Sequence, residues 1–133
     1  MHTSRSNSLL WVMLVSIGGW TLDGRVQAAA TVGQITVVSH VDVIPDEYKP
    51  QSEEKAAALF RAETTATQRD KGYISYVVLR QVDGGNHFTI IESWADSSAY
   101  AAHAASEHTI SFRRNILEYL GSPFDARVHQ VFK

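Results

Sequence analysis

The chain has 133 residues, no cysteine, and twelve Lys and Arg against fourteen Asp and Glu, for a formal net charge of −2 at pH 7. This length allows a single domain, and the lack of cysteine excludes disulfides, thiol catalysis, zinc–thiolate sites and a lipid anchor on an N-terminal cysteine. The charge balance, without a basic stripe to neutralise phosphates, argues against nucleic acid as a partner.

The first thirty residues predict a secretory signal peptide. A polar start precedes the apolar run Leu9–Trp20, and small residues follow it. This order is typical of a signal, with cleavage after Ala28 or Ala30. The apolar run is shorter than the roughly 20 residues that span a bilayer. We therefore expect residues 1–30 to be removed, residues 31–133 to form the mature domain, and the protein to be secreted or periplasmic without stable membrane insertion.

The sequence of the mature domain predicts four strands and three helical segments. Strands are indicated by β-branched residues and by alternation of apolar and polar side chains, and helices by apolar residues at helical spacing. In chain order we expect a strand at 35–44, a helix from 49 or 50 to 69, strands at 73–82 and 87–95, helical segments at 97–106 and 109–120, and a strand at 125–132. The turn Asp83–Asn86 is expected to join the second and third strands as a hairpin.

This β-α-β-β-α-β order is that of the ferredoxin-like unit, an α+β fold. Helices would cover one sheet face, and strands 35–44 and 73–82 carry apolar residues on both faces. An apolar second face does not stay wet on a soluble monomer, and a second copy covers it in a symmetric dimer. We therefore expect a homodimer. Tyr76 and Arg80 are expected to line its cleft or to face solvent.

The segment His87–Phe112 carries the residues best suited to chemistry. Its strand ends in Glu92-x-Trp94, and the helix that follows has His103 nine residues after the Trp. This arrangement resembles the antibiotic biosynthesis monooxygenase family, which includes the quinol monooxygenases. The resemblance covers residues 35–132. It implies a dimeric α/β barrel and a cofactor-independent monooxygenase that oxidises a quinol or a related polyphenolic or aromatic substrate with O2.

The resemblance also implies catalytic roles. Trp94 would form the pocket wall, and the Tyr100 hydroxyl would stabilise a developing phenolate. His103 would remove a phenolic proton, as a neutral imidazole does near pH 7. The alternatives are a core Trp, a packing Tyr and a His that packs under the sheet. His108 is a substrate contact or the alternative base, because the junction between helical segments leaves the helix phase open.

Three further residues are expected to contact the substrate. Arg114 follows Trp94 by twenty residues, about the spacing at which the polyketide oxygenases of the family hold an anionic oxygen, and Arg113 is its alternative. Glu92 would orient a pocket group or form a buried pair. Ser39 stands at about the position where haem-degrading relatives place an Asn.

One position departs from the family pattern. Ile90 occupies the place where the polyketide-oxygenase branch tends to have an Asn. This loss of a polar pocket group argues against identical substrate handling.

No cofactor or metal is expected. His103 and His108 are five residues apart, and on a continuous helix this spacing points them apart, whereas the two-His motif of zinc proteases needs four. No Gly-rich phosphate loop follows a strand and opens a helix, so a flavin or nucleotide site has no support. Because a fold does not fix a function, two alternatives stay open: a non-catalytic dimeric barrel that binds a hydrophobic metabolite, and a haem-binding or haem-degrading relative.

Overall fold

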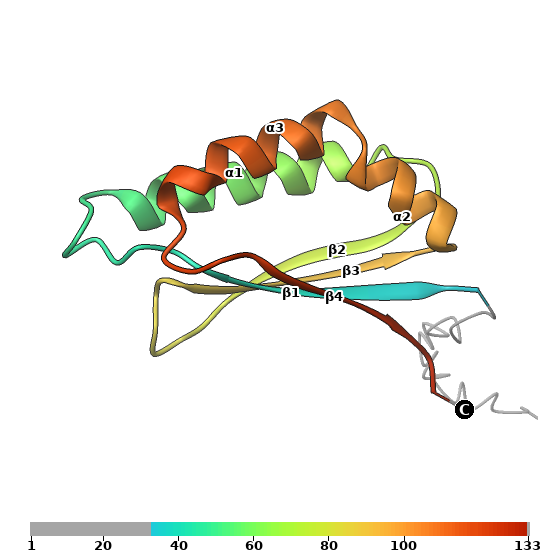
Figure 1. Ribbon diagram of the computed structural model, residues 1–133, viewed down its shortest axis with the longest axis horizontal. Coiled ribbons are helices and arrows are strands. Elements are labelled where there is room, and N and C mark those ends of the chain that lie inside the picture. The colour runs from blue at the N-terminus through green and yellow to red at the C-terminus, as the bar shows by residue number, and fades with distance from the viewer. Residues whose placement is uncertain (1–32, 133) are drawn as a thin grey trace, which may run out of the picture.

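The computed structural model describes residues 33–132 as an antiparallel four-stranded sheet with helices on one face (Figure 1). The strand order is β2-β3-β1-β4. The elements are β1 (Ile35–Asp42), α1 (Ser52–Thr67), β2 (Tyr73–Arg80), β3 (His87–Trp94), α2 (Ser97–Ala104), α3 (Glu107–Ile116), a 3-10 turn η1 (Leu117–Tyr119) and β4 (Asp125–Gln130). The expected ferredoxin-like α+β fold is confirmed. The predicted signal peptide lies outside the described residues.

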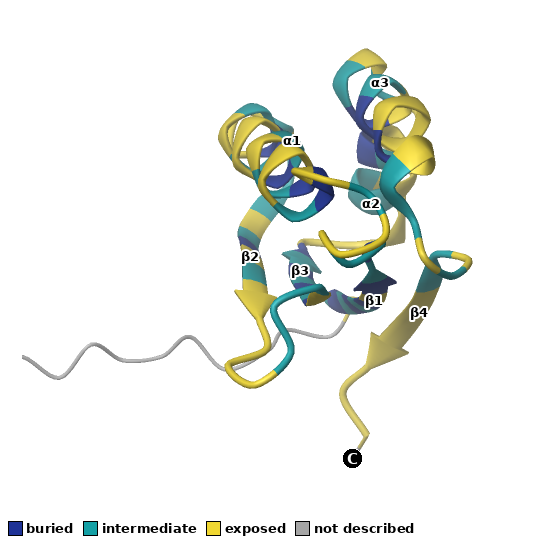
Figure 2. Cartoon of the chain, turned by 90° about the vertical axis from the view of Figure 1, so that its left-hand side faces the viewer, coloured by how far each residue is buried: buried dark blue, intermediate teal, exposed yellow. Residues whose placement is uncertain are grey.

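Alternation along β1 and β3 decides which side chains lie under the helices. The buried, helix-facing residues of these two strands are Ile35, Val37, Ser39, Val41, Phe88, Ile90, Glu92 and Trp94. The register places Ile35 opposite Trp94 and Ser39 opposite Ile90. Figure 2 shows the buried residues between the sheet and the helical layer. The faces expected from the period of two are therefore the observed ones.

Helix α1 begins at Ser52, later than expected, because Gln51 before it has a left-handed backbone, φ 66°. The Asp46 carboxylate accepts the backbone N–H of Glu53 at 3.0 Å, which satisfies one of the free donors at the helix start. After α1 the chain turns at Gly72 in a left-handed conformation, φ 79°. A Cβ there would lie 2.5 Å from the Cβ of Ala99. Glycine thus lets the loop that holds Asp70 lie directly against α2.

The second helical region breaks between α2 and α3. The Ser106 side chain accepts the backbone N–H of Thr109 at 3.3 Å and so caps α3. The break lies two residues earlier than the sequence predicted on both sides, because Ser106 starts a helix rather than ending one. It also changes the direction of the chain, and the rings of His103 and His108 come within 5.5 Å of each other.

The sheet face away from the helices carries an apolar row across three strands. Val77 pairs with Ile91, and Ile91 pairs with Val38. Val77 is 46% exposed. Tyr76 points to the other side and is buried under the helices, so the expectation that it faces a dimer cleft or solvent was wrong. Within the described part of the chain, no helix is long and apolar enough to cross a membrane.

Candidate functional site

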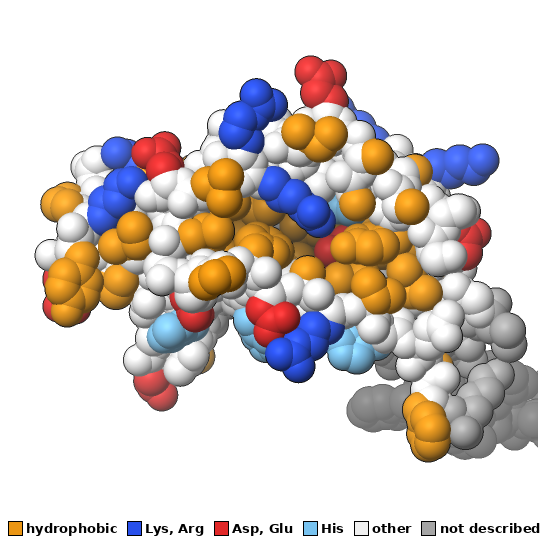
Figure 3. Space-filling view, viewed as in Figure 1, with side chains coloured by type: hydrophobic (Ala, Val, Ile, Leu, Met, Phe, Trp, Pro, Cys, Tyr) orange, Lys and Arg blue, Asp and Glu red, His pale blue; other side chains and the backbone are white. Residues whose placement is uncertain are grey.

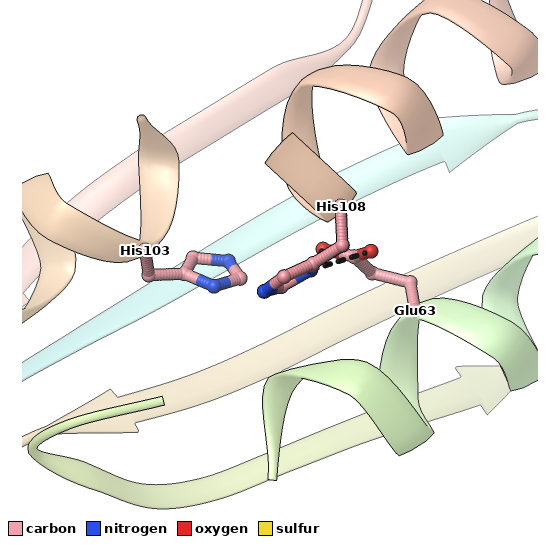
Figure 4. Close-up of side chains that lie close together, drawn as sticks. All are labelled: Glu63, His103 and His108. Atoms are coloured by element: carbon pink, nitrogen blue, oxygen red, sulfur yellow. Dashed lines mark hydrogen bonds and ion pairs between the residues drawn. The ribbon is translucent and has the colours of Figure 1, made fainter. Parts of the chain in front are cut away.

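A closed ring of hydrogen-bonded side chains lies between the helices and the sheet. We call it the polar ring; it consists of Glu63 from α1, Asp70 from the loop after α1, His103 from α2, and His108 and Thr109 from α3. His103 Nδ1 lies 2.8 Å from Asp70 Oδ2, and His108 Nε2 lies 3.1 Å from the same oxygen. His108 Nδ1 is 3.0 Å from Glu63 Oε2. The Thr109 hydroxyl donates to Glu63 Oε1 at 2.8 Å and lies 3.3 Å from His103 Nδ1. Figure 4 shows Glu63, His103 and His108 pointing toward one another.

Strand β3 adds a branch to the polar ring. The indole N–H of Trp94 donates to Glu92 Oε2 at 2.8 Å, and this oxygen lies 3.5 Å from His103 Nε2. The Trp94 ring also stacks on the imidazole of His103, with centroids 4.5 Å apart. Tyr76 approaches the same imidazole edge-on at 6.2 Å. His103 is therefore fixed in orientation, with one nitrogen toward Asp70 and the other toward Glu92.

Burial and hydrogen bonds shift the pKa values of the acid–base groups in opposite directions. Burial raises the pKa of Glu92, and the hydrogen bond from Trp94 opposes this only in part. Burial alone would raise the pKa of Asp70, but hydrogen bonds with His103 and His108 outweigh it and lower that pKa. Burial alone would lower the pKa of His108, but hydrogen bonds to Glu63 and Asp70 raise it. Asp70 is therefore an anion near neutral pH, and His108 holds a proton more readily than an ordinary histidine.

A small polar cavity lies next to the ring. Its volume of about 10 Å³ holds about one water molecule. The lining residues come from all layers and are Ser39, Glu63, Tyr76, Ile90, Glu92, His103, Thr109, Phe112, Arg113 and Phe124. Arg113 and Phe124 also line a neighbouring apolar cavity of about 240 Å³. Figure 3 shows hydrophobic side chains gathered in the hollow between α3 and β4 on this side. Arg113 and Phe124 thus separate the acid–base groups from an apolar space open to the surface.

A larger cavity, about 680 Å³, lies between α1 and the edge strand β2. It shares only Tyr76 with the polar cavity, and neither His103 nor Glu92 lines it. Size alone does not make a reaction site. We therefore place the candidate site at the polar ring, where titratable groups with shifted pKa values converge.

Comparison with known proteins agrees with this fold. A family model described as antibiotic biosynthesis monooxygenase matches residues 46–115, which is more than half of the chain. This chain belongs to the antibiotic biosynthesis monooxygenase family. The family resemblance inferred from His87–Phe112 is confirmed. A search of curated proteins gives no match.

Several solved structures are similar to this family member. Rv0793 from Mycobacterium tuberculosis has a TM-score of 0.67 at 23% identity, over 75% of this chain and 96% of Rv0793. A conserved protein from Methanosarcina mazei Go1 has a TM-score of 0.66 at 22% identity, over 73% and 91% of the two chains. SnoaB from Streptomyces nogalater, described as a cofactor-independent oxygenase, has a TM-score of 0.65 at 15% identity, over 76% and 95%. At these identities the likeness shows the shared fold.

In this member of the family, the structure brings together most residues that the sequence selected. Trp94, His103, His108 and Glu92 form one contact network. Ser39 is buried beside them and lines the polar cavity.

Four of the selected residues do not line the polar cavity: Trp94, Tyr100, His108 and Arg114. Tyr100 packs against the Trp94 cluster, 6.4 Å from the His103 ring between centroids, and is not among the residues that line the cavity. Arg114 does not line it either, and its neighbour Arg113 does. The helix phase after the break between α2 and α3 places Arg113, and not Arg114, at the cavity.

The sequence did not single out Glu63, Asp70 and Thr109 as site residues. One signal was available for Glu63: it shares the buried stripe of α1 with Ala56, Phe60 and Thr67, where a charged residue needs a partner. Asp70 directly follows the expected end of the first helix at residue 69, and no pattern there marks it as a site residue. Nothing local distinguishes Thr109, because its partners come from α1 and α2.

The site also bears on metal binding. Ligand atoms of Glu63, His103 and His108 lie within 4.8 Å of one another, since the break between α2 and α3 removes the continuous helix on which the expectation of diverging histidines depended. However, the Thr109 hydroxyl lies among them, 2.8 Å from Glu63, 3.3 Å from His103 and 3.4 Å from His108. Within residues 33–132, every buried side-chain nitrogen and oxygen has a hydrogen-bond partner. This arrangement favours proton exchange along hydrogen bonds.

Proposed function

We propose that this protein is a cofactor-independent monooxygenase that oxidises a quinol or a related polyphenol with O2. The observation that carries the proposal is the setting of His103. Its imidazole is 3% exposed, is stacked under Trp94 and is held between Asp70 and Glu92. A histidine ordered in this way, at the wall of the polar cavity, is a suitable base for a phenolic hydroxyl.

The two neighbouring cavities suggest how a substrate would lie. The aromatic ring would occupy the apolar cavity and direct a hydroxyl past Arg113 and Phe124 toward His103. The apolar cavity is smaller than the roughly 300–1,000 Å³ of typical ligand pockets, so binding requires these two side chains to move apart. Arg113 would then contact an anionic substrate oxygen.

The chemistry needs no reductant other than the substrate. His103 takes the hydroxyl proton, and the resulting anion gives one electron to O2. The radical pair, protected from water by the apolar walls, joins through a new C–O bond to form a peroxide. When the O–O bond breaks, one oxygen leaves as water, and quinol plus O2 becomes hydroxyquinone plus H2O. Trp94 lines neither cavity, and its indole, stacked on the imidazole of His103, would hold that base in place.

The test is oxygen uptake by the metal-free mature protein with a panel of hydroquinones and anthrones. His103→Ala should reduce the rate by roughly 100-fold or more, the usual scale for a positioned base. It should change the binding of a quinone product far less, because a quinone has no proton to give. Trp94→Ala should lower the rate, because the imidazole of His103 loses the indole stacked on it, and should change binding less, because Trp94 lines neither cavity. Lys55→Ala, at an exposed position of α1 outside the cavities and the open sheet face, is the control and should change neither.

A different result would support the second function. If the wild-type protein binds quinones but consumes no oxygen with any quinol, it is a binding protein for a hydrophobic metabolite. The apolar cavity between η1 and β4 is the feature that suits this alternative. Haem binding has less support, since both imidazoles of the polar ring are engaged by carboxylates.

We also propose that the protein works as a secreted or periplasmic homodimer. The signal-like order of residues 1–30 supports export. The apolar row of Val77, Ile91 and Val38 on the open sheet face supports the dimer. An apolar row on this face needs a second layer of protein to cover it.

A further inference from the structure

We infer that the polar ring is a proton relay that connects the buried polar cavity with solvent in a recess between α1 and α3. The inference builds on the proposed oxidation, because it assigns the route by which the substrate proton leaves His103 and returns. It gives Asp70, His108 and Glu63 a function that the sequence did not suggest.

The ring lies between two spaces of different character. His103 lines the polar cavity on the inner side and is 3% exposed. His108 lines a recess of about 230 Å³ on the outer side, and 27% of its side chain is exposed. Glu63 lines both spaces. The ring therefore reaches from a site closed to bulk water to one that water and buffer molecules can enter.

The path between these ends is continuous. His103 Nδ1 contacts Asp70 at 2.8 Å, Asp70 contacts His108 Nε2 at 3.1 Å, and His108 Nδ1 contacts Glu63 at 3.0 Å. All three distances are those of ordinary hydrogen bonds. An imidazole suits a relay because it accepts a proton on one nitrogen and releases one from the other. The Thr109 hydroxyl, between Glu63 and His103, offers a second connection.

The pKa shifts of Asp70 and His108 favour movement of a proton from the inner to the outer end of the ring. Hydrogen bonds lower the pKa of Asp70 below its usual range and raise that of His108. A proton on Asp70 therefore passes readily to His108. Within residues 33–132, the titratable and charged groups that face the two histidines from the elements packed against them are Glu63, Asp70, Tyr76, Glu92, Tyr100 and Arg113.

Each transfer breaks one bond to hydrogen and forms another. The substrate O–H breaks and Nε2–H forms on His103, whose Nδ1–H then passes to Asp70. Asp70 protonates His108 at Nε2, and the Nδ1 proton of His108 passes to Glu63 or to water in the recess. A proton returns by the reverse steps when the peroxide O–O bond breaks and water leaves. The cycle thus consumes only the quinol and O2.

The relay is tested at its outer end with His108→Ala. In dilute buffer we expect quinol turnover to fall by roughly 10-fold or more, less than for loss of the base itself. Added imidazole should restore turnover as its concentration rises, because it can enter the recess that the missing ring leaves. Glu107→Gln removes an exposed acid next to His108 and serves as the control. Turnover that does not fall, or that falls without any response to imidazole, would overturn the relay.

A second experiment needs no turnover and separates failure of the relay from failure of the proposed function. Nuclear magnetic resonance of the wild-type protein measures how fast the imidazole N–H of His103 exchanges with water. A relay makes this exchange fast despite burial, and Asp70→Asn and His108→Ala should each slow it by about tenfold or more. Imidazole should restore the rate in His108→Ala. Unchanged exchange in both variants contradicts the relay, whether or not the protein consumes oxygen.

Discussion

Glu92 is the residue whose environment departs most from that of an ordinary carboxyl group on a strand. Burial raises its pKa, while Trp94 donates to it and His103 lies 3.5 Å away. In the sequence it was simply an inward-facing acid between two apolar positions. Its partners are visible only once β3 and α2 are in place, which explains why its role was left between a pocket group and a buried pair.

Glu92→Gln should remove a pH dependence of stability. The folded protein holds the Glu92 proton above the carboxyl's ordinary pKa of 4.5. The folded state therefore binds more protons than the unfolded state in the window from 4.5 up to the raised value, and Glu92 makes stability fall as pH rises through that window. Gln cannot titrate but still accepts from Trp94. Urea unfolding across this window should show the variant gaining stability relative to wild type as pH rises. A constant difference would contradict the prediction.

Arg113 and Arg114 form a matched pair for testing the substrate contact. Arg113 lines both cavities and Arg114 lines neither. A charge-assisted hydrogen bond contributes about 1.5–3 kcal/mol, so Arg113→Ala should raise the KM for a quinol about tenfold or more. Arg114→Ala should leave KM unchanged. Oxygen uptake over a range of quinol concentrations measures both, and equal effects of the two variants would remove Arg113 from the pocket.

At the scale of elements, the break between α2 and α3 determines which side chains meet in the polar ring. The sequence correctly predicted two helical segments but placed the first end at Ser106 and the second start at Thr109. Ser106 instead caps α3 and accepts from the N–H of Thr109. That shift of phase turns His108 toward Glu63, forty-five residues earlier in the chain. Strand faces follow from local alternation, whereas this contact depends on α1 and α3 lying side by side, which no local pattern contains.

Ser106→Ala should therefore disturb both stability and the site. Loss of an N-cap costs about 1 kcal/mol. Ser106 also donates to the Thr109 hydroxyl at 3.0 Å, so the polar ring should loosen and the raised pKa of His108 should return toward its ordinary value. Urea unfolding and a histidine titration by nuclear magnetic resonance measure the two effects.

Asp96→Ala is the control for that variant. Asp96 caps α2 by accepting the backbone N–H of Ala99 at 2.8 Å, and within residues 33–132 its hydrogen bonds go to residues of α2 and not to the polar ring. Its loss should also lower stability but should leave the His108 titration in place. If both variants shift His108 alike, the capping of α3 has no special influence on the site.

For the whole molecule, export is the prediction that rests on sequence alone. The apolar run Leu9–Trp20 and the small residues before Thr31 predict cleavage after Ala28 or Ala30. Expression of the full chain in a bacterium and intact mass of the protein from the periplasm or medium decide it. A mature product that still contains the apolar run contradicts a cleaved signal.

The open sheet face bears on the assembly of the whole molecule. Ile91 lies at the centre of the row that Val77 and Val38 complete, and Leu79 beside it is 49% exposed. If two copies pack through this face, Ile91→Lys places two like charges in a desolvated contact, which costs several kcal/mol. Light scattering at micromolar concentration should then give twice the chain mass for the wild type and the chain mass for the variant. Ile110→Lys, the same change at an exposed position of α3, should remain dimeric. A wild-type monomer would refute the dimer, and a dimeric Ile91→Lys would place its interface on another face.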